Sequence, residues 1–275
     1  MNPPDRPPAV VAVCGHESAN GAALRDVPGI APVAGGREAY RLVRELLRGQ
    51  ERLCVVPMTL GRDHALVADA ARALLALPAE ERARVVLAEP FGTAEHLVGW
   101  LRAAANRLAP EAALLVTAPV GGPFEDAELY RIARLVRQYG RHSLVEVALG
   151  GGDPDPAEGV RRCRLLGAER VALLPAAFAA VEPPDPPEGA FPAGPLLAPA
   201  AIARVARARA ADAWSRWRAS GADGLGAALA AEHGHGYGHS HGPDEDRHHD
   251  HDHSHPHADG HGHRALADPV RRKSP

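Results

Sequence analysis

Short apolar segments alternate with amphipathic helical patterns from residue 9 to about residue 175, and this alternation limits the possible folds more than any other feature. Apolar runs of four to eight residues bounded by turn residues are typical of buried strands, whereas apolar residues spaced three and four apart mark one helical face. Strands that alternate with helices form parallel sheets covered by helices on both faces. The chain is therefore predicted to be an α/β protein.

The predicted elements follow one another in a regular order. The strands are predicted at residues 9–14, 30–34, 52–58, 83–90, 113–119, 143–150 and 170–176. The helices are predicted at residues 37–49, 64–77, 93–108, 126–140, 156–168 and 200–219. Because Pro32 cannot donate to a strand ladder, the second strand is expected at a sheet edge. The proline-rich residues 181–199 are expected to form a loop or linker.

Two segments match each other and indicate an internal duplication. "LLRGQERLCVVPM" (46–58) and "RLLGAERVALLPA" (164–176) both contain a helix end, a glycine, Glu-Arg, an apolar strand and a proline. A repeat period above 100 residues indicates a duplicated domain, because solenoid repeats are much shorter. We expect two similar halves, residues 1–110 and 111–220, facing each other across a cleft. Residues 221–275 lack an apolar period and are expected to be disordered.

The composition excludes several classes of protein. Lys273 is the only lysine, so a GxxxxGK[ST] phosphate loop is absent and Schiff-base chemistry on a lysine is not expected. The net charge of -3 gives no reason to expect a nucleic acid or a membrane surface as partner. Three cysteines without a CxxC pair fit a reducing compartment, and the sequence pattern predicts neither a signal peptide nor a membrane-spanning run. We therefore expect a cytoplasmic monomer or homodimer.

Two histidines directly follow predicted strands of the first half. His16 comes just after the strand at 9–14, and His64 follows the strand at 52–58. Ligands of parallel sheets bind beyond the carboxyl ends of the strands, so both imidazoles are expected at one edge. The alternative is that each is a loop histidine whose nitrogens are satisfied by hydrogen bonds.

Other titratable residues near the strand ends were considered as ligands. Glu17 and Glu89 are expected at the same edge as the two histidines and are candidate carboxylate ligands, although a solvated carboxylate is the default for each. His96, in the first turn of a helix, and His142, before a strand, are interpreted as structural.

Four segments, in this order, resemble the CbiX-type sirohydrochlorin chelatases of cobalamin and siroheme biosynthesis. They are "GHES" (15–18), "VVPMTLGRDH" (55–64), "EPFGTAEHLVGWL" (89–101) and "GGDPDPAEGVRRCRLLGAERVALLP" (151–175). The resemblance covers roughly residues 9–180 and is closest to the long form of the family, which has two similar halves. Some members also carry histidine-rich segments.

The resemblance implies a lyase that inserts a divalent metal into sirohydrochlorin without ATP or another nucleotide. Cobalt is the preferred metal substrate, with iron or nickel as alternatives. His16 and His64 occupy the matching positions and would bind the metal or accept the pyrrole protons, which suits imidazole because its pKa lies near neutrality. Arg62, beside His64, is the best candidate to bind a carboxylate of the tetrapyrrole.

The sequence also departs from the family pattern. Glu17 stands where the family has glycine, the loop before His64 is about one residue shorter, and "VAGG" (33–36) lacks the carboxylate that often follows the second strand. "APVGGP" (118–123) in the second half lacks a histidine. A non-catalytic metal chaperone or storage protein on a degenerate chelatase fold is therefore the second hypothesis.

The C-terminal segment contains twelve of the 16 histidines. They are interspersed with Asp and Gly, so they favour weak binding of borderline divalent metals at many sites. Three interpretations remain open: a passive tail, a metal store, or a tethered supply that raises the metal concentration near the cleft. We prefer the third. The tail residues predicted to bind metal are His233, His235, His239, His241, His248, His249, His251, His253, His255, His257, His261 and His263.

Overall fold

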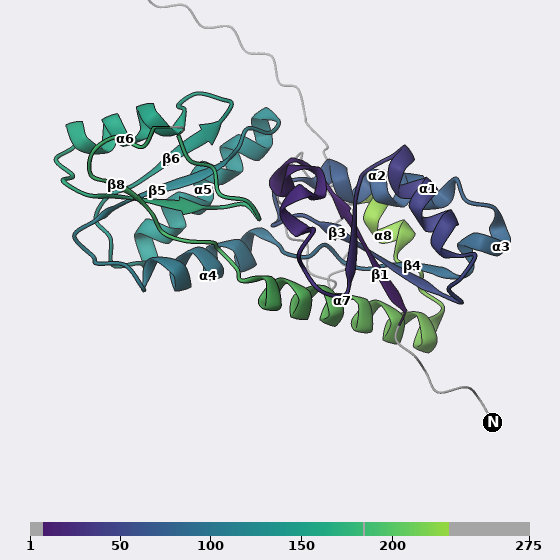
Figure 1. The fold of residues 1–275 in the computed structure, drawn as a ribbon. Coiled ribbons are helices and arrows are strands. Elements are labelled where there is room, and N and C mark those ends of the chain that lie inside the picture. The colour runs from purple at the N-terminus through teal and green to yellow at the C-terminus, as the bar shows by residue number, and fades with distance from the viewer. Residues whose placement is uncertain (1–7, 184, 231–275) are drawn as a thin grey trace, which may run out of the picture. The chain divides into compact units, whose positions relative to one another are not determined.

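The computed structural model describes residues 8–183 and 185–230, which contain two four-stranded parallel sheets (Figure 1). The first sheet has the strand order β2-β1-β3-β4 and the second has the order β6-β5-β7-β8. Every neighbouring pair of strands is parallel. The predicted α/β class with parallel sheets is thus confirmed. The strands are β1 (Ala9–Cys14), β2 (Ile30–Ala34), β3 (Leu53–Met58), β4 (Val85–Leu87), β5 (Ala113–Pro119), β6 (Val145–Gly150), β7 (Val171–Pro175) and β8 (Ala190–Pro192).

The two sheets are built in the same way. Pro57 of β3 pairs with Val13 of β1, and Pro175 of β7 pairs with Thr117 of β5 in the equivalent place. The sequence match between residues 46–58 and 164–176 therefore joins equivalent elements. Strand β2 lies at a sheet edge, as its proline predicted. Strand β8 was not predicted, because its three residues lie in a proline-rich segment with no alternating pattern.

Six helices match the predicted ranges, and three short ones, η1, α3 and α8, are additional. In chain order, the helices of the described residues are the 3-10 segment η1 (His16–Leu24), α1 (Arg37–Leu46), α2 (His64–Leu75), α3 (Ala79–Arg82), α4 (Ala94–Ala105), α5 (Pro123–Tyr139), α6 (Pro156–Leu165), α7 (Pro199–Ser220) and α8 (Leu225–Ala230).

Helix α5 begins three residues before its predicted start. Pro123 occupies the first turn, where a missing N–H costs nothing. The Glu125 carboxylate accepts a hydrogen bond from the backbone N–H of Gly122 at 2.9 Å, which satisfies one donor at the helix start. The sequence Gly-Gly-Pro at residues 121–123 is typical of a turn, so it did not predict this first turn of the helix. The consequence is that Glu125 has a fixed position at the carboxyl end of β5.

Helices α7 and α8 follow the second sheet in the sequence but pack on the first one (Figure 1). Helix α7 contacts β1, β3 and β4, although the predicted boundaries placed it in the second half. Helix α8 packs on α2 and buries Leu225 and Ala228. The expected disorder from residue 221 is therefore wrong for residues 225–230, because these apolar side chains complete the first core. The histidines from His233 onward lie outside the described residues.

Elements of both halves share one hydrophobic core. Phe91, which follows β4, packs edge-on against Phe178, which follows β7, with ring centroids 5.1 Å apart. Phe91 is fully buried, and Leu60 and Leu196 belong to the same cluster. The carboxyl ends of β3 and β7 are thus held by common packing. In the part of the chain that the structure describes, none of the helices combines the length and apolar character needed to cross a membrane.

Candidate functional site

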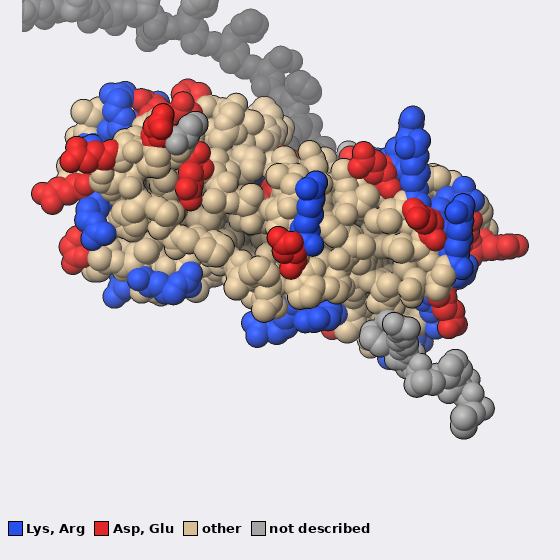
Figure 2. Space-filling model, viewed as in Figure 1, with Lys and Arg blue, Asp and Glu red and all other residues tan. Residues whose placement is uncertain are grey.

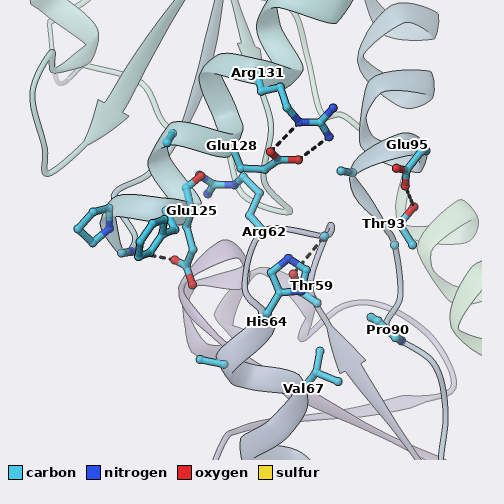
Figure 3. Close-up of a pocket in the computed structure, with 18 residues that line it drawn as sticks. Thr59, Arg62, His64, Val67, Pro90, Thr93, Glu95, Glu125, Glu128 and Arg131 are labelled. Carbon is cyan, nitrogen blue, oxygen red and sulfur yellow. Dashed lines mark hydrogen bonds and ion pairs between the residues drawn. The ribbon is translucent and has the colours of Figure 1, made fainter. Parts of the chain in front are cut away.

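A cleft of about 900 Å³ lies beyond the carboxyl ends of β3 and β4 (Figure 3). One wall comes from the first half, and the opposite wall comes from the first two turns of α5. This is the place that the rule for parallel sheets predicts for a ligand. The residues that line it are Thr59, Gly61, Arg62, His64, Ala65, Val67, Pro90, Gly92, Thr93, Ala94, Glu95, Gly122, Pro123, Phe124, Glu125, Ala127, Glu128 and Arg131.

His16 is not among the residues that line this cleft, but it lies between two carboxylates, one of which, Glu125, is part of the lining. Its Nδ1 is 3.2 Å from Oδ2 of Asp63, and its Nε2 is 3.5 Å from Oε2 of Glu125. Asp63 belongs to the first half, directly before α2, whereas Glu125 belongs to α5 in the second half. The His16 Nε2 atom is buried and has no hydrogen-bond partner. Nδ1 of His16 is therefore paired with Asp63, whereas Nε2 has no hydrogen-bond partner.

Two glycines allow the carboxylates to approach His16. A Cβ atom on Gly15 would lie 2.5 Å from Oδ2 of Asp63, and a Cβ atom on Gly121 would overlap Oε2 of Glu125. Asp63 is held further by its other oxygen, which accepts a hydrogen bond from the backbone N–H of Leu66 at 2.9 Å and caps α2. Because Gly15 and Gly121 have no side chain, both carboxylates can lie next to the imidazole.

The ionisation of the pair follows from its contacts. The hydrogen bond to Asp63 raises the pKa of His16, and burial of the imidazole opposes this only in part. Burial would raise the pKa of Asp63, but the hydrogen bonds from His16 and from the Leu66 N–H outweigh it and hold that pKa below its usual value. The pair therefore favours an imidazolium beside a carboxylate until another cation or a base competes for the imidazole.

His64 is the first residue of α2 and lines the cleft half-buried. It directly follows Asp63, and its charge contributes to the lowered pKa of that carboxylate. The structure thus places His16 and His64 on the same edge, each close to Asp63, as their positions after β1 and β3 predicted. Figure 3 shows Arg62 on the loop after β3 and His64 next to it, at the start of α2.

Arg62, the predicted carboxylate-binding residue, touches the cleft but has no exposed side-chain surface. Its guanidinium donates to Oε1 of Glu17 at 3.4 Å and to the backbone carbonyl oxygens of Pro119 and Glu125. These contacts join the loop after β3 to the second half. In this arrangement the donors of Arg62 hold the two cleft walls together and do not point at a ligand.

Glu17, a predicted metal ligand, is also buried, with 1% of its surface exposed. Its carboxylate accepts hydrogen bonds from the Thr59 hydroxyl at 2.5 Å and from the Leu60 N–H at 2.9 Å. Burial raises the pKa of Glu17, although Arg62 and Thr59 oppose this effect. The carboxylate faces the interior because its oxygens are engaged there. The sequence position next to His16 did not reveal this, since neighbouring side chains point in different directions.

Glu89, the other predicted carboxylate ligand, follows β4 but pairs with α7. Its two oxygens lie 3.1 Å from Arg216 and 3.4 Å from Arg209. Glu89 does not line the cleft, and the structure does not bring it together with His16 and His64.

Within residues 8–183 and 185–230, no group of three or more His, Cys, Asp or Glu side chains is arranged to hold a metal ion.

The remaining cleft lining combines carboxylates with apolar surface. Phe124 lines the cleft and is 82% exposed. Glu128 pairs with Arg131 through two short contacts of 2.6–2.7 Å, and Glu95 accepts a hydrogen bond from Thr93. Because Arg62 is enclosed, Arg131 is the cleft arginine with substantial exposure, at 52%. The accessible cleft surface therefore carries more negative than positive groups, which favours cations.

Charge elsewhere on the surface is mixed. On the face shown in Figure 2, basic and acidic side chains of the coloured residues are interspersed, without an extended patch of one sign. This pattern agrees with the small net charge of -3.

Sequence reasoning missed Asp63 and Glu125. Asp63 was within a quoted motif, and its position one residue before a predicted helix is typical of an N-cap. Glu125 follows the glycines after β5, so the rule that ligands bind beyond strand ends pointed to its neighbourhood. Nothing in the local pattern indicated that it would meet His16, which is 109 positions earlier in the chain (125 minus 16).

No family model matches the sequence, and no curated protein matches it. Among solved structures, the chain resembles a multi-domain protein of Deinococcus radiodurans that is described as structurally similar to chelatases but with two additional novel domains. The TM-score is 0.41 and the sequence identity is 21%. The similarity covers 76% of this chain and 59% of that one, so this chain spans only part of the other protein.

Proposed function

We propose that this protein inserts a divalent metal ion into a sirohydrochlorin-type tetrapyrrole without a nucleotide. Cobalt is the preferred metal substrate, and iron or nickel are alternatives. The observation that carries the proposal is the His16–Asp63 pair, which adjoins two residues of the cleft lining, Glu125 and His64. The order of the motifs around these residues, which resembles the sirohydrochlorin chelatases, supports the same reaction.

The reaction exchanges one divalent cation for two protons. The two pyrrole N–H bonds break, their electron pairs bind the metal, and both protons leave. Asp63 accepts a hydrogen bond from Nδ1–H of His16, so Nε2 is the basic nitrogen whenever the imidazole is neutral, and it faces Glu125. His64 supplies a second imidazole on the same edge. Each imidazole is suited to take one proton, at a time when its basic nitrogen holds no metal, and to pass it to water.

The cleft offers the macrocycle both space and contacts. Its volume of about 900 Å³ lies within the range of small-molecule sites. Phe124 presents an exposed ring that suits a planar conjugated ligand, and Val67 and Pro90 add apolar surface. Arg131 replaces Arg62 as the arginine that we expect to meet a substrate carboxylate, because its side chain is accessible.

A metal chaperone or store remains the second candidate. The observation that favours it is the excess of carboxylates in the cleft: Glu95, Glu125 and Glu128 outnumber the accessible arginine, Arg131. Such a lining attracts a metal cation more strongly than a polycarboxylate macrocycle. The histidine-rich tail suits this function equally well.

The test is anaerobic incubation of the full chain with sirohydrochlorin and Co²⁺, followed by absorbance of the metallated product. Insertion faster than in a protein-free control is expected, and Fe²⁺ and Ni²⁺ are compared under the same conditions. If none of the three metals is inserted faster than in the control, the chelatase proposal is wrong. Stoichiometric retention of metal under those conditions then supports the chaperone or store.

A further inference from the structure

We propose that Glu125 of the second half binds the metal ion together with His16 of the first half, so that the cation sits between the two walls of the cleft. The proposal deepens the proposed function, and it rests on that function only in taking a divalent cation as the cargo. Its ligand atoms are Nε2 of His16 and Oε2 of Glu125, and Asp63 is the residue that orients the imidazole.

The geometry of the two atoms suits a shared cation. Nε2 and Oε2 are 3.5 Å apart, which is too long for a good hydrogen bond. A cation about 2.1 Å from each atom, the usual distance for imidazole and carboxylate ligands, would subtend an angle of roughly 110°. That angle is close to tetrahedral. The buried Nε2 has no hydrogen-bond partner, so a bound cation would satisfy it.

The surroundings of His16 match those of a metal-binding histidine. Such histidines almost always donate the other ring N–H to a carboxylate or carbonyl oxygen, which fixes the ring and its tautomer. Asp63 occupies that position at 3.2 Å from Nδ1. Asp63 is itself held by the Leu66 N–H, so the ring orientation is set by the start of α2.

Glu125 is also held in place before any cation arrives. Its Oε2 accepts the hydrogen bond from the Gly122 N–H, and Gly121 leaves the space in which the carboxylate lies. The carboxylate is mostly enclosed, with 19% of its side chain exposed. Glu125 thus brings a carboxylate of the second half to His16 of the first half.

A site with two protein ligands suits a metal ion that must later be released. A closed set of four ligands holds metal as a structural element, whereas open positions allow exchange with water or with another ligand. The remaining positions are available to water, to His64 or to the nitrogens of the macrocycle. Because the two ligands come from different halves, separation of the cleft walls would weaken the site.

The experiment measures Co²⁺ binding directly, by anaerobic titration with calorimetry and visible d–d absorbance. The background is the full-length chain with its twelve tail histidines changed to Gln, so that the tail does not contribute. In this background Glu125→Gln is compared with Glu128→Gln, which removes the same charge from the same cleft one turn further along α5. Gln at position 125 keeps an acceptor for the Gly122 N–H, so α5 should retain its cap.

We expect Glu125→Gln to weaken Co²⁺ binding by at least about 10-fold and to alter the d–d spectrum, whereas Glu128→Gln should change affinity by less than about threefold. Gly121→Ala should act like Glu125→Gln, because its methyl group displaces the carboxylate. Equal affinity of Glu125→Gln and the background, or an equal loss in Glu128→Gln, would overturn the proposal.

The insertion assay separates this inference from the proposed function. Glu125-dependent Co²⁺ binding in a protein that inserts no metal would leave the cation site valid and refute the chelatase. Active insertion in the parent, with Co²⁺ binding unaffected by Glu125→Gln, would refute the cation site and leave the chelatase valid.

Discussion

The carboxyl edges of the two sheets have the same architecture but different chemistry. Both sheets have the same strand order, and β3 and β7 both carry a proline at equivalent positions. After β1 the chain continues with Gly15 and His16, whereas the equivalent positions in the second half are Pro119, the last residue of β5, and Val120. The first half thus has imidazoles at its edge, and the second half has a glycine turn followed by Glu125.

This difference shows which features can vary between two sheets of the same topology. The strand order and the core depend on many apolar residues, so they are retained in both halves. The side chains at the strand ends contribute less to folding, so one edge keeps titratable groups while the other supplies the opposing wall. The cleft is therefore asymmetric in chemistry although its two sheets are alike in topology.

The largest expected effect comes from removing the imidazoles that distinguish the first edge. His16→Ala or His64→Ala should lower the rate of metal insertion by roughly 10²-fold or more, the range for a positioned acid or base. The rate is measured anaerobically by absorbance of the metallated product. His96→Gln is the control, because His96 caps α4 and glutamine serves the same role. Parent rates in both alanine variants would contradict the assignment.

A smaller effect is expected from the residue that orients His16. Asp63→Asn should lower the affinity for Co²⁺ and the insertion rate by about 10- to 100-fold, the usual cost of losing such a partner. Asp155→Asn is the matched control in the second half, since Asp155 caps α6 through its side chain without a neighbouring histidine. If both variants lose the same activity, helix capping explains the loss and the orienting role of Asp63 is wrong.

Removal of the histidine-rich C-terminal segment tests whether that segment supplies metal to the histidines at the carboxyl edge of the first sheet. Deletion of residues 231–275, which spares the buried Leu225 and Ala228 of α8, should reduce the bound metal from several ions to about one per chain. The rate at saturating metal should stay within about twofold, and the rate at limiting metal should fall because the tethered store is lost. Metal is counted after equilibrium dialysis. Unchanged stoichiometry and rate would identify a passive tail.

The smallest effect concerns the titration of the metal-free His16–Asp63 pair. Since the folded pKa of His16 is raised, its contribution to the free energy of unfolding is complete below its ordinary pKa of about 6.5 and is lost as pH rises through the raised value. Asp63, with a lowered pKa, contributes above about pH 4 and loses its contribution as pH falls through that lowered value. The pair should therefore stabilise the fold most between about pH 4 and 6.5.

NMR titration of the His16 ring protons measures this effect. Asp63→Asn should move the His16 midpoint to lower pH. A His16 midpoint that is identical in the parent and in Asp63→Asn would show that the pair does not form in solution.

The sequence by itself determined the class of fold, the duplication and the positions of His16 and His64. These follow from local patterns. The spacing of apolar residues along the chain predicts whether a segment is a strand or a helix, and the carboxyl ends of parallel strands lie at one edge of the sheet. The same patterns did not reveal α8 or β8, because short elements depend on packing against the rest of the fold.

Only the tertiary structure decided which charged side chains reach the cleft. Arg62 and Glu17 are enclosed together, Glu89 turns toward α7, and Glu125 meets His16 from the other half. A carboxylate or guanidinium takes the direction in which partners replace its lost hydration, and those partners come from distant segments. Local sequence therefore placed the imidazoles on the edge, and the packing of the two halves selected the groups that surround them.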